Sequence, residues 1–357
     1  MTLLFEPLTI RGVEFSNRAW VAPMCQYSAD SNGIVGDWHL VTLGAYATGK
    51  AGLVMAEATG VSPQARISVA CPGIWNDDQV VAWKRITNFI HSQGVKAGIQ
   101  LAHAGRKAST QSPFLGGQVL APKEGGWETL SATDKPFHDM STPKAMDQAD
   151  IDRTIGDFTK AAANADKAGF DVIELHSAHG YLMHQFLSPL SNDRTDEYGG
   201  SLENRMRFPL MVAKAVRDAW PEDKPLFVRI SATDWADGGW HIADSVAYVK
   251  ALEKLGVDLI DASSGGTLNN AAIPNEVNYQ IDLAAQIKAH TGVLTAAVGR
   301  ITQSEQAEQL LADNKADACF LARQMLRDPH WPLRAAHELG AKIRWSDQMR
   351  AGAGWSN

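Results

Sequence analysis

Two histidines and a tyrosine stand close together in the segment His176-Ser177-Ala178-His179-Gly180-Tyr181, and His184 follows three residues later. Two imidazoles and a phenol leaving one strand end can converge on a ligand oxygen as hydrogen-bond donors, and the phenol can also donate a proton. Two other interpretations stay open. A zinc site needs more ligands, which no nearby carboxylate or cysteine supplies at a familiar spacing. A histidine pair with a purely structural role needs no further ligand.

Cys25 lies in the segment Pro23-Met24-Cys25-Gln26-Tyr27, just past an apolar run that is typical of a strand. A lone thiol is usually a small buried apolar group, whereas a position at a strand end also suits a functional one. Cys71 and Cys319 lack such a position, and Cys319 is expected in the core. Three scattered cysteines without a C-x-x-C pair exclude a disulfide framework and favour a reducing compartment.

Polar side chains interrupt other apolar runs, namely Glu57, Gln100, His103 and Arg229. A charge buried on a strand is costly unless it has a partner or a ligand. Arg229 is the most informative of the four. Its guanidinium can pair with Glu57 or Glu174, or it can face an anionic ring system.

The last two apolar runs end in small residues followed by arginines, at Gly299-Arg300 and Ala322-Arg323. Barrels commonly bind a phosphate at this place, on backbone N–H groups and the start of a short helix. The other interpretation is a tight turn with a solvated arginine. We favour the phosphate site.

The elements that must position these residues repeat along the chain. Eight short apolar runs alternate with amphipathic stretches, as in βα units around a parallel sheet, and their near-continuous hydrophobicity indicates strands buried on both faces. The runs are 18–23, 52–58, 95–103, 170–176, 226–231, 257–263, 293–299 and 316–322. Helices are expected, among other places, at 77–92, 151–168, 201–220, 244–255 and 304–313.

Gly94, Gly169 and Gly256 each stand between a helical stretch and the next strand, where a left-handed C-cap is expected. Eight such units predict a single (β/α)8 TIM barrel. An open doubly wound sheet would usually be shorter and would carry a Gly-rich fingerprint after its first strand, which is absent. Long loops after strands three and four would lie at the C-terminal face, where barrels build active sites. We expect the barrel over residues 1–340 and a tail over 341–357.

Composition narrows the classes of function. The chain has 357 residues and a formal net charge of −7 without a block of like charges, so neither nucleic acid nor an anionic membrane is an expected partner. No stretch approaches the roughly 18 apolar residues of a membrane helix, and the N-terminus lacks a basic leader region. These features predict a cytoplasmic protein.

Six segments together resemble the old yellow enzyme family of flavin-dependent ene-reductases. The similarity extends over nearly the whole chain, and its longest blocks are highly specific. Cys25, the short length and Tyr27 look like the bacterial thermophilic-like subclass. The matching segments are PMCQYSA at Pro23, DWH at Asp37, EAT at Glu57, QLAHAGRKA at Gln100, ELHSAHGYLMHQFLSP at Glu174 and NDRTDEYGGSLENRMRF at Asn192.

The resemblance implies a TIM barrel that holds FMN without a covalent link and takes NADPH or NADH as reductant. It implies an NADPH dehydrogenase or ene-reductase that reduces the C=C bond of α,β-unsaturated carbonyl or nitro compounds in a ping-pong cycle. The implied contacts to the FMN ring or ribityl chain are Pro23, Met24, Cys25, Ala58, Gln100 and Arg229. Gly299, Ala322 and Arg323 would hold the phosphate, and Cys25 would tune the reduction potential.

The same resemblance assigns the substrate site. His176 and His179 would bind the carbonyl or nitro oxygen of an activated alkene, Tyr27 would line the same pocket, and Tyr181 would donate the proton. No metal is implied. The remaining alternative is a flavin-binding module without catalysis, against which the His176 to Tyr181 cluster speaks, because flavin binding does not require these groups.

The resemblance also implies a homodimer or homotetramer. Members of the subclass often end in a Gln-Tyr-x-Arg segment whose arginine enters the neighbouring subunit's pocket. Here the tail reads Asp347-Gln348-Met349-Arg350-Ala351, so the tyrosine is missing and the arginine is one position early. A role for Arg350 in a neighbouring site therefore departs from the family pattern.

Overall fold

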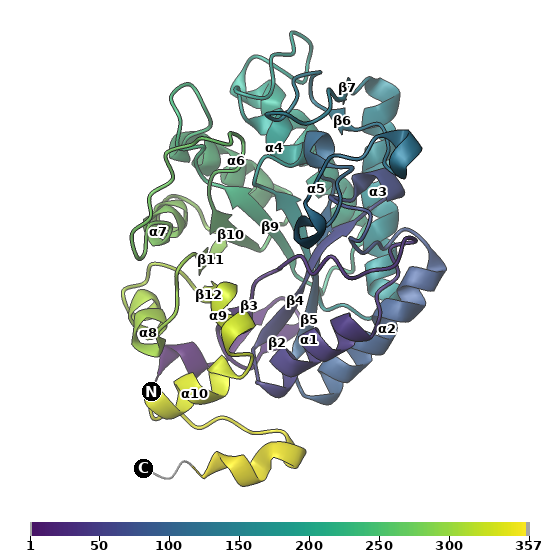
Figure 1. The fold of residues 1–357 in the computed structure, drawn as a ribbon. Coiled ribbons are helices and arrows are strands. Elements are labelled where there is room, and N and C mark those ends of the chain that lie inside the picture. Colours follow the sequence, from purple (N-terminus) through teal and green to yellow (C-terminus); the bar gives the residue numbers. More distant parts are fainter. Residues whose placement is uncertain (1, 355–357) are drawn as a thin grey trace.

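Eight parallel strands close into a barrel in a computed structural model that describes residues 2–354 (Figure 1). Each strand pairs with its neighbour in chain order, and the last pairs with the first. The barrel strands are β3 (Ala19–Val21), β4 (Leu53–Gly60), β5 (Lys96–Ala102), β8 (Val172–Ser177), β9 (Leu226–Ser231), β10 (Leu259–Ser263), β11 (Leu294–Val298) and β12 (Ala318–Leu321). All eight apolar runs are strands, which confirms the predicted TIM barrel.

The strands are apolar throughout because both of their faces are covered. Nearly every barrel-strand residue is buried, as expected when side chains fill the barrel on one face and helices pack on the other. The helices that follow the strands in turn are α1 (Asp37–Thr48), α2 (Asp77–Ser92), α3 (Gln148–Lys167), α5 (Leu202–Ala219), α6 (Ile242–Lys254), α7 (Ile281–His290) and α8 (Ser304–Ala312).

Helix boundaries follow from local chemistry. The Asn76 side chain accepts a hydrogen bond from the Gln79 amide at 3.0 Å and so begins α2. The three glycines expected to end helices do adopt a left-handed backbone. The helix predicted at 151–168 begins at Gln148 rather than at Ile151, because the Asp147 side chain caps its N-terminus.

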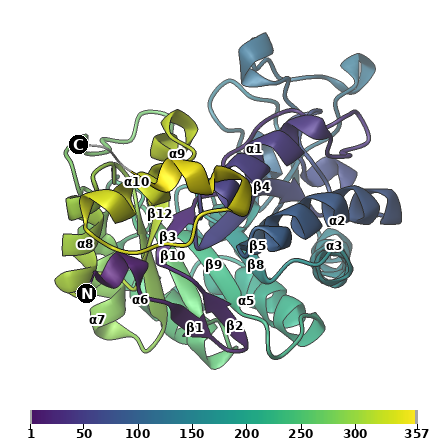
Figure 2. The same ribbon diagram turned by 90° about the horizontal axis from the view of Figure 1, so that it is seen from below.

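The N-terminal end of the barrel is closed by a hairpin that the eight-run pattern does not predict (Figure 2). Its strands are β1 (Leu8–Ile10) and β2 (Val13–Phe15). Phe15 packs against Trp20 with ring centroids 4.8 Å apart, and Trp20 stacks on Phe227 at 5.8 Å. These aromatic rings fill the lower part of the barrel, so ligands must bind at the other end.

Both long loops lie at the C-terminal end of the barrel, at the top of Figure 1. The loop after β5 contains three short 3-10 helices and the two-stranded sheet of β6 (Leu130–Ser131) and β7 (Lys144–Ala145). The loop after β8 begins with α4 (Leu182–Leu187). This end of the molecule is therefore the one on which the long loops build a site.

The chain ends in α9 (Arg323–Arg327), α10 (Trp331–Glu338) and a short 3-10 helix, η6 (Asp347–Ala353). The Ser346 hydroxyl donates to Gln93 Oε1 at 2.8 Å, which fixes the start of η6 against the barrel. Arg350 is exposed and pairs with Asp347. The last three residues of the predicted tail lie outside the described residues. Within residues 2–354, no helix is both long enough and apolar enough to cross a membrane.

Candidate active site

The His176 to Tyr181 segment forms a tight cluster of rings at the end of β8. The ring of His176 lies 5.2 Å from that of His179 and 4.9 Å from that of Tyr181, centroid to centroid, and both pairs meet edge to face. Within residues 2–354, neither the Tyr181 hydroxyl nor His176 Nε2 makes a hydrogen bond. Three hydrogen-bonding groups with free capacity therefore gather on one turn, as the sequence predicts.

The turn that carries these rings is shaped by two glycines. His179 and Gly180 both have a positive φ, of 58° and 68°. A methyl group on Gly180 would overlap the carbonyl oxygen of Gly266, and a methyl group on Gly266 would overlap the backbone of His179. The loops after β8 and β10 thus interlock at a contact that only glycine permits on either side.

Hydrogen bonds orient both imidazoles. His176 Nδ1 accepts from the Ala178 amide at 3.4 Å, so its Nε2 carries the proton of the neutral ring. His179 Nε2 lies 2.7 Å from the Ser263 hydroxyl, and the His179 amide donates to Ser231 Oγ at 2.9 Å. When Ser263 donates to Nε2, His179 Nδ1 carries the proton and becomes the second donor.

Burial keeps these groups uncharged. It lowers the pKa of His176 and of His179 well below the usual range, and the charges of Arg229 and Lys107 lower both pKa values further. Burial likewise raises the pKa of Tyr181 well above its usual value. At neutral pH the cluster therefore offers two imidazole N–H donors and one protonated phenol.

Lys107 belongs to this cluster, although the sequence reasoning did not identify it. Its ammonium donates to the carbonyl oxygens of His179 and Gly266, at 2.9 and 3.2 Å, and lies 5.0 Å from the centre of the Tyr181 ring. Burial lowers its pKa to about 8. Its position directly after the β5 strand end was the signal in the sequence that could have indicated a role.

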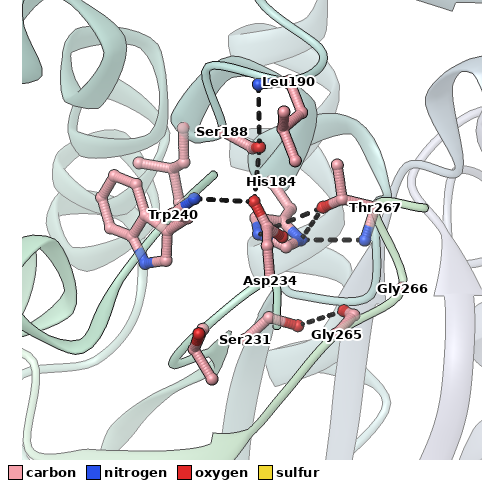
Figure 3. A network of polar contacts seen from close by, with 12 residues as sticks. His184, Ser188, Leu190, Ser231, Asp234, Trp240, Gly265, Gly266 and Thr267 are labelled. Carbon is pink, nitrogen blue, oxygen red and sulfur yellow. Dashed lines mark hydrogen bonds and ion pairs between the residues drawn. The ribbon is translucent and has the colours of Figure 1, made fainter. Parts of the chain in front are cut away.

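A buried polar network holds the far side of the turn (Figure 3). His184 Nδ1 accepts from the Gly180 amide at 2.9 Å, while His184 Nε2 lies 3.3 Å from Asp234 Oδ1. Asp234 Oδ2 accepts from the Ser188 hydroxyl at 2.6 Å and the Trp240 amide at 2.8 Å. His184, which carries no assigned role in the sequence interpretation, thus fixes the backbone of the turn at His179 and Gly180.

The loop after β3 carries the predicted residues Pro23, Met24, Cys25 and Tyr27. The Gln26 amide donates to Glu57 Oε2 at 2.8 Å, and Glu57 Oε1 lies 3.2 Å from His39 Nε2, so a buried carboxylate ties this loop to β4. A bulge of β4 at Glu57 places Ala58 beside Gln100 of β5. Burial raises the pKa of Cys25, so that it is an uncharged thiol.

Arg229 lies at the centre of the barrel, between His176 on β8 and Asp261 on β10. Neither Glu57 nor Glu174, two of the partners that the sequence left open, forms an ion pair with it. Its Nε lies 3.1 Å from Asp261 Oδ2, because Asp261 is directly opposite in the register.

Arg229 is 7% exposed and makes no hydrogen bond within residues 2–354. Nearby, Gln100 donates to Glu174 Oε1 at 2.7 Å. Burial raises the pKa of the Glu174 and Asp261 carboxyls, and the charge of Arg229 opposes this. A buried guanidinium that forms an ion pair with Asp261 but makes no hydrogen bond within residues 2–354 keeps donors for a ligand that brings acceptors.

The predicted phosphate residues share one cavity. Gly299, Ala322 and Arg323 line a space of about 340 Å³ at the ends of β11 and β12, together with Arg300 and Arg327. Gly299 has a φ of 111°, and a side chain there would collide with Gln280. Within residues 2–354, neither Arg323 nor Arg327 forms an ion pair or hydrogen bond through its side chain. The cavity therefore offers uncompensated positive charge and bare backbone to an anion.

The other residues singled out in the sequence are buried in the interior of the protein. Cys71 and Cys319 are buried, and Cys319 lies within β12. His103 is buried and accepts from the Gly105 amide at 3.0 Å through Nδ1, outside the ring cluster. Within residues 2–354, no group of three or more His, Cys, Asp or Glu side chains is placed to hold a metal ion.

Comparison with known proteins finds close relatives over the whole chain. Residues 3–342 match the family described as NADH:flavin oxidoreductase / NADH oxidase. The chain is 47% identical over 353 residues to an NADPH dehydrogenase of Geobacillus thermodenitrificans (strain NG80-2), covering 98% of each. It is 47% identical over 342 residues to an NADPH dehydrogenase of Bacillus velezensis, covering 95% of this chain and 96% of the relative.

Two solved structures share the fold. Morphinone reductase in complex with tetrahydroNAD superposes with a TM-score of 0.78 at 28% identity, covering 96% of this chain and 92% of that one. A 2-naphthoyl-CoA reductase in complex with 2-naphthoyl-CoA gives a TM-score of 0.85 at 25% identity. It covers 95% of this chain, which spans only 52% of that longer protein.

Proposed function

The chain belongs to the NADH:flavin oxidoreductase / NADH oxidase family, as an FMN-dependent NAD(P)H oxidoreductase of the old yellow enzyme type, and we propose that it reduces the C=C bond of α,β-unsaturated carbonyl or nitro compounds. The observation that carries the proposal is the cluster of His176, His179 and Tyr181, whose free donors meet on one turn. Binding of FMN alone does not need these groups.

The residues present fit FMN. The cavity at Gly299, Ala322 and Arg323 has the uncompensated charge that a phosphate neutralises. Arg229, which is buried and makes no hydrogen bond within residues 2–354, suits the polar edge of a flavin ring, and Gln100 lies on β5, two strands away. The loop of Pro23, Met24 and Cys25, with Ala58 beside it, would complete the ring and ribityl contacts, and the neutral Cys25 thiol would tune the reduction potential.

FMN, reduced by NADPH or NADH, supplies the hydride that the β-carbon of the alkene receives. His176 and His179 bind the carbonyl or nitro oxygen, and their N–H groups stabilise the negative charge that develops there. Neutral imidazoles can fill this role because each ring still carries one N–H donor. Tyr27 lines the same pocket from the loop after β3.

Tyr181 delivers the proton to the α-carbon. Its raised pKa keeps the hydroxyl protonated at neutral pH, and the absence of a hydrogen-bond partner within residues 2–354 leaves that proton available. Reductant and alkene would occupy the same donors in turn, which agrees with a ping-pong order.

Replacement of either histidine tests the function. His176→Ala and His179→Ala should retain FMN but lose about 10² or more in the rate of reoxidation by cyclohexenone, since each removes one donor to the developing charge. The measurement is the anaerobic bleaching of flavin absorbance by NADPH, followed by its return when the enone is added. His290→Ala, an exposed histidine on α7, is the control.

Three outcomes are informative. Undiminished reoxidation in both variants would remove the assigned roles. Return of the colour with air as fast as with enone would favour an oxidase over an ene-reductase. A protein that stays colourless with added FMN would contradict FMN binding itself.

We further propose a cytoplasmic homodimer or homotetramer in which the tail from residue 341 contacts a neighbouring subunit. The support is the exposed η6 segment with Arg350 on it, whose start is anchored to the barrel through Ser346. Light scattering of the purified protein gives the mass that tests the assembly.

A further inference from the structure

A second cavity, of about 460 Å³, lies at the C-terminal end of the barrel beside the catalytic turn. Phe137, Leu190 and Leu268 contribute apolar surface to it, and Arg106, Lys135 and His138 contribute basic groups. The proposed chemistry of His176, His179 and Tyr181 uses none of these residues. An apolar wall beside several cations suits a ligand that joins a flat ring to an anionic group.

The cavity is directly connected to the catalytic cluster. The Lys107 ammonium lies 4.4 Å from the centre of the Phe137 ring and 5.0 Å from that of Tyr181, so that it stands between the cavity and the turn. Thr267, which lines the cavity, follows the glycine that interlocks with Gly180. A dinucleotide with its reactive ring at the catalytic donors must place its remaining parts on neighbouring loops such as these.

Arg106 is the central cation of the cavity. It is 4% exposed, yet its guanidinium donates only to the backbone carbonyls of Lys135, Pro136 and Thr267, at 3.3, 3.4 and 3.1 Å. Its Nε has no hydrogen-bond partner, and within residues 2–354 it forms no ion pair. A buried guanidinium without a carboxylate retains the charge and the free donor that an anion can use.

The two outer basic side chains are available as well. Lys135 pairs with Asp193 at 2.9 Å, His138 Nδ1 lies 2.7 Å from Asp139, and all four side chains are more than 40% exposed. Exposed pairs of this kind contribute little to stability, so the Lys135 ammonium and the His138 ring can turn to a phosphate at small cost. The three basic groups of one cavity can then share a single dianion.

We propose that this cavity binds the adenosine 2′-phosphate of NADPH and thereby gives the enzyme a preference for NADPH over NADH. The two reductants differ only in this phosphate, so only a site that recognises it can distinguish them. Phe137 contributes an aromatic ring to the lining of the cavity, beside the place of the adenosine. The inference relies on the use of NAD(P)H, which the family assignment supports, and does not depend on which alkene is reduced.

The test removes the exposed cations, because their loss leaves the buried Arg106 contacts intact. Holoenzyme of the double variant Lys135→Ala/His138→Ala is titrated by calorimetry with 2′,5′-ADP and with 5′-AMP. Wild type should bind 2′,5′-ADP about tenfold more tightly than 5′-AMP, and the variant should lose most of that difference, since charge-assisted contacts are lost. The matched control is Lys250→Ala/Lys254→Ala, which removes two exposed cations from α6.

The second measurement is anaerobic bleaching of the flavin without any alkene. The variant should need about tenfold more NADPH for half-maximal rate, while its dependence on NADH should stay within about twofold of wild type. Equal changes for the two reductants, or no change for either, would overturn the proposal. Flavin bleaching that is normal in wild type while enones fail to reoxidise it would contradict the alkene assignment alone.

Discussion

Both histidines are neutral, and their hydrogen-bond partners influence which ring nitrogen carries the proton. For His176, the Ala178 amide at Nδ1 fixes the proton on Nε2. For His179, a Ser263 hydroxyl that donates to Nε2 places the proton on Nδ1. In the proposed mechanism, this serine at the end of β10 therefore favours the tautomer that points a donor at the substrate oxygen.

Ser263→Ala should lower the rate of enone reduction roughly tenfold without loss of FMN. Without the hydroxyl, the two tautomers of His179 become closer in energy, and the productive one is no longer enforced; a hydrogen bond of this kind contributes about 1 kcal/mol. The measurement is the oxidative half-reaction by stopped flow. Ser92→Ala removes an exposed hydroxyl on α2 and should change nothing. An unchanged rate in Ser263→Ala would show that His179 holds its tautomer without this serine.

The lowered pKa of Lys107 leads us to expect that enone reduction depends on pH. Burial lowers its pKa to about 8, so the ammonium that braces the His179 and Gly266 carbonyls is lost as the pH rises through that value. The charged neighbour of Lys107 is Arg106, on its own segment. The side chains of His176, His179 and Tyr181 also face it, but they stay neutral at this pH. Enone reduction should therefore fall roughly fivefold above pH 8, because the cation next to Tyr181 disappears.

Lys107→Met tests this dependence. The variant should be slow at pH 7 and should lack the decline between pH 7 and 9, as measured by the pH profile of flavin reoxidation. The effect of rising pH on the stability of the fold is opposite to its effect on activity. A lysine whose pKa is lower in the folded protein binds fewer protons there than when unfolded, so wild type should gain stability between about pH 8 and 10. A decline that persists in the variant would assign it to another group.

At the scale of elements, the catalytic turn depends on the contact between two loops. Gly180 and Gly266 allow the loops after β8 and β10 to touch backbone to backbone, and the pair of His184 and Asp234 holds the turn from behind. The rings are thus positioned by the contact between these two loops and by the His184–Asp234 pair, and not only by their packing against one another.

Gly180→Ala should lower enone reduction by at least about tenfold and destabilise the fold, because the new methyl group overlaps the Gly266 carbonyl and must displace the turn. Gly238→Ala is a matched control. Gly238 has a φ of 69°, almost the same as the 68° of Gly180, but no atom lies within 4 Å of a methyl group placed there.

The control should lose only the roughly 1 kcal/mol of a left-handed alanine and keep its activity. Thermal unfolding and stopped-flow reoxidation measure the two effects separately. Equal losses in both variants would mean that the effect of Gly180→Ala comes from backbone strain and not from the contact between the loops.

The elements were predictable where the hydrophobic pattern is strong. All eight strands could be located because burial on both faces requires continuous apolar runs, and Gly94 marked a helix end because its left-handed conformation has few alternatives. The hairpin of β1 and β2 was missed, because two three-residue strands carry too short a pattern. The partner of Arg229 was also missed, since only the register of β9 against β10 places Asp261 opposite it.

At the scale of the molecule, the FMN site exists only when the barrel is closed. Its proposed residues come from segments as distant as Cys25 and Arg323, which meet because β12 pairs with β3. An unfolded chain cannot hold these groups together, so FMN should bind the native state alone. Ligand binding of this kind raises the free energy of unfolding by about 2.7 kcal/mol at a concentration 100 times the dissociation constant.

Arg323→Ala separates cofactor binding from folding. The side chain makes no hydrogen bond or ion pair within residues 2–354, so the melting temperature of the apoprotein should stay within about 1 °C of wild type. With FMN added, wild type should melt several degrees higher, and the variant should lose most of that rise, because one cation of the phosphate cavity is gone. Arg85→Ala, which removes an exposed arginine on α2, should behave as wild type. A fall of the apoprotein's melting temperature as large as that of the holoenzyme would make Arg323 a structural residue.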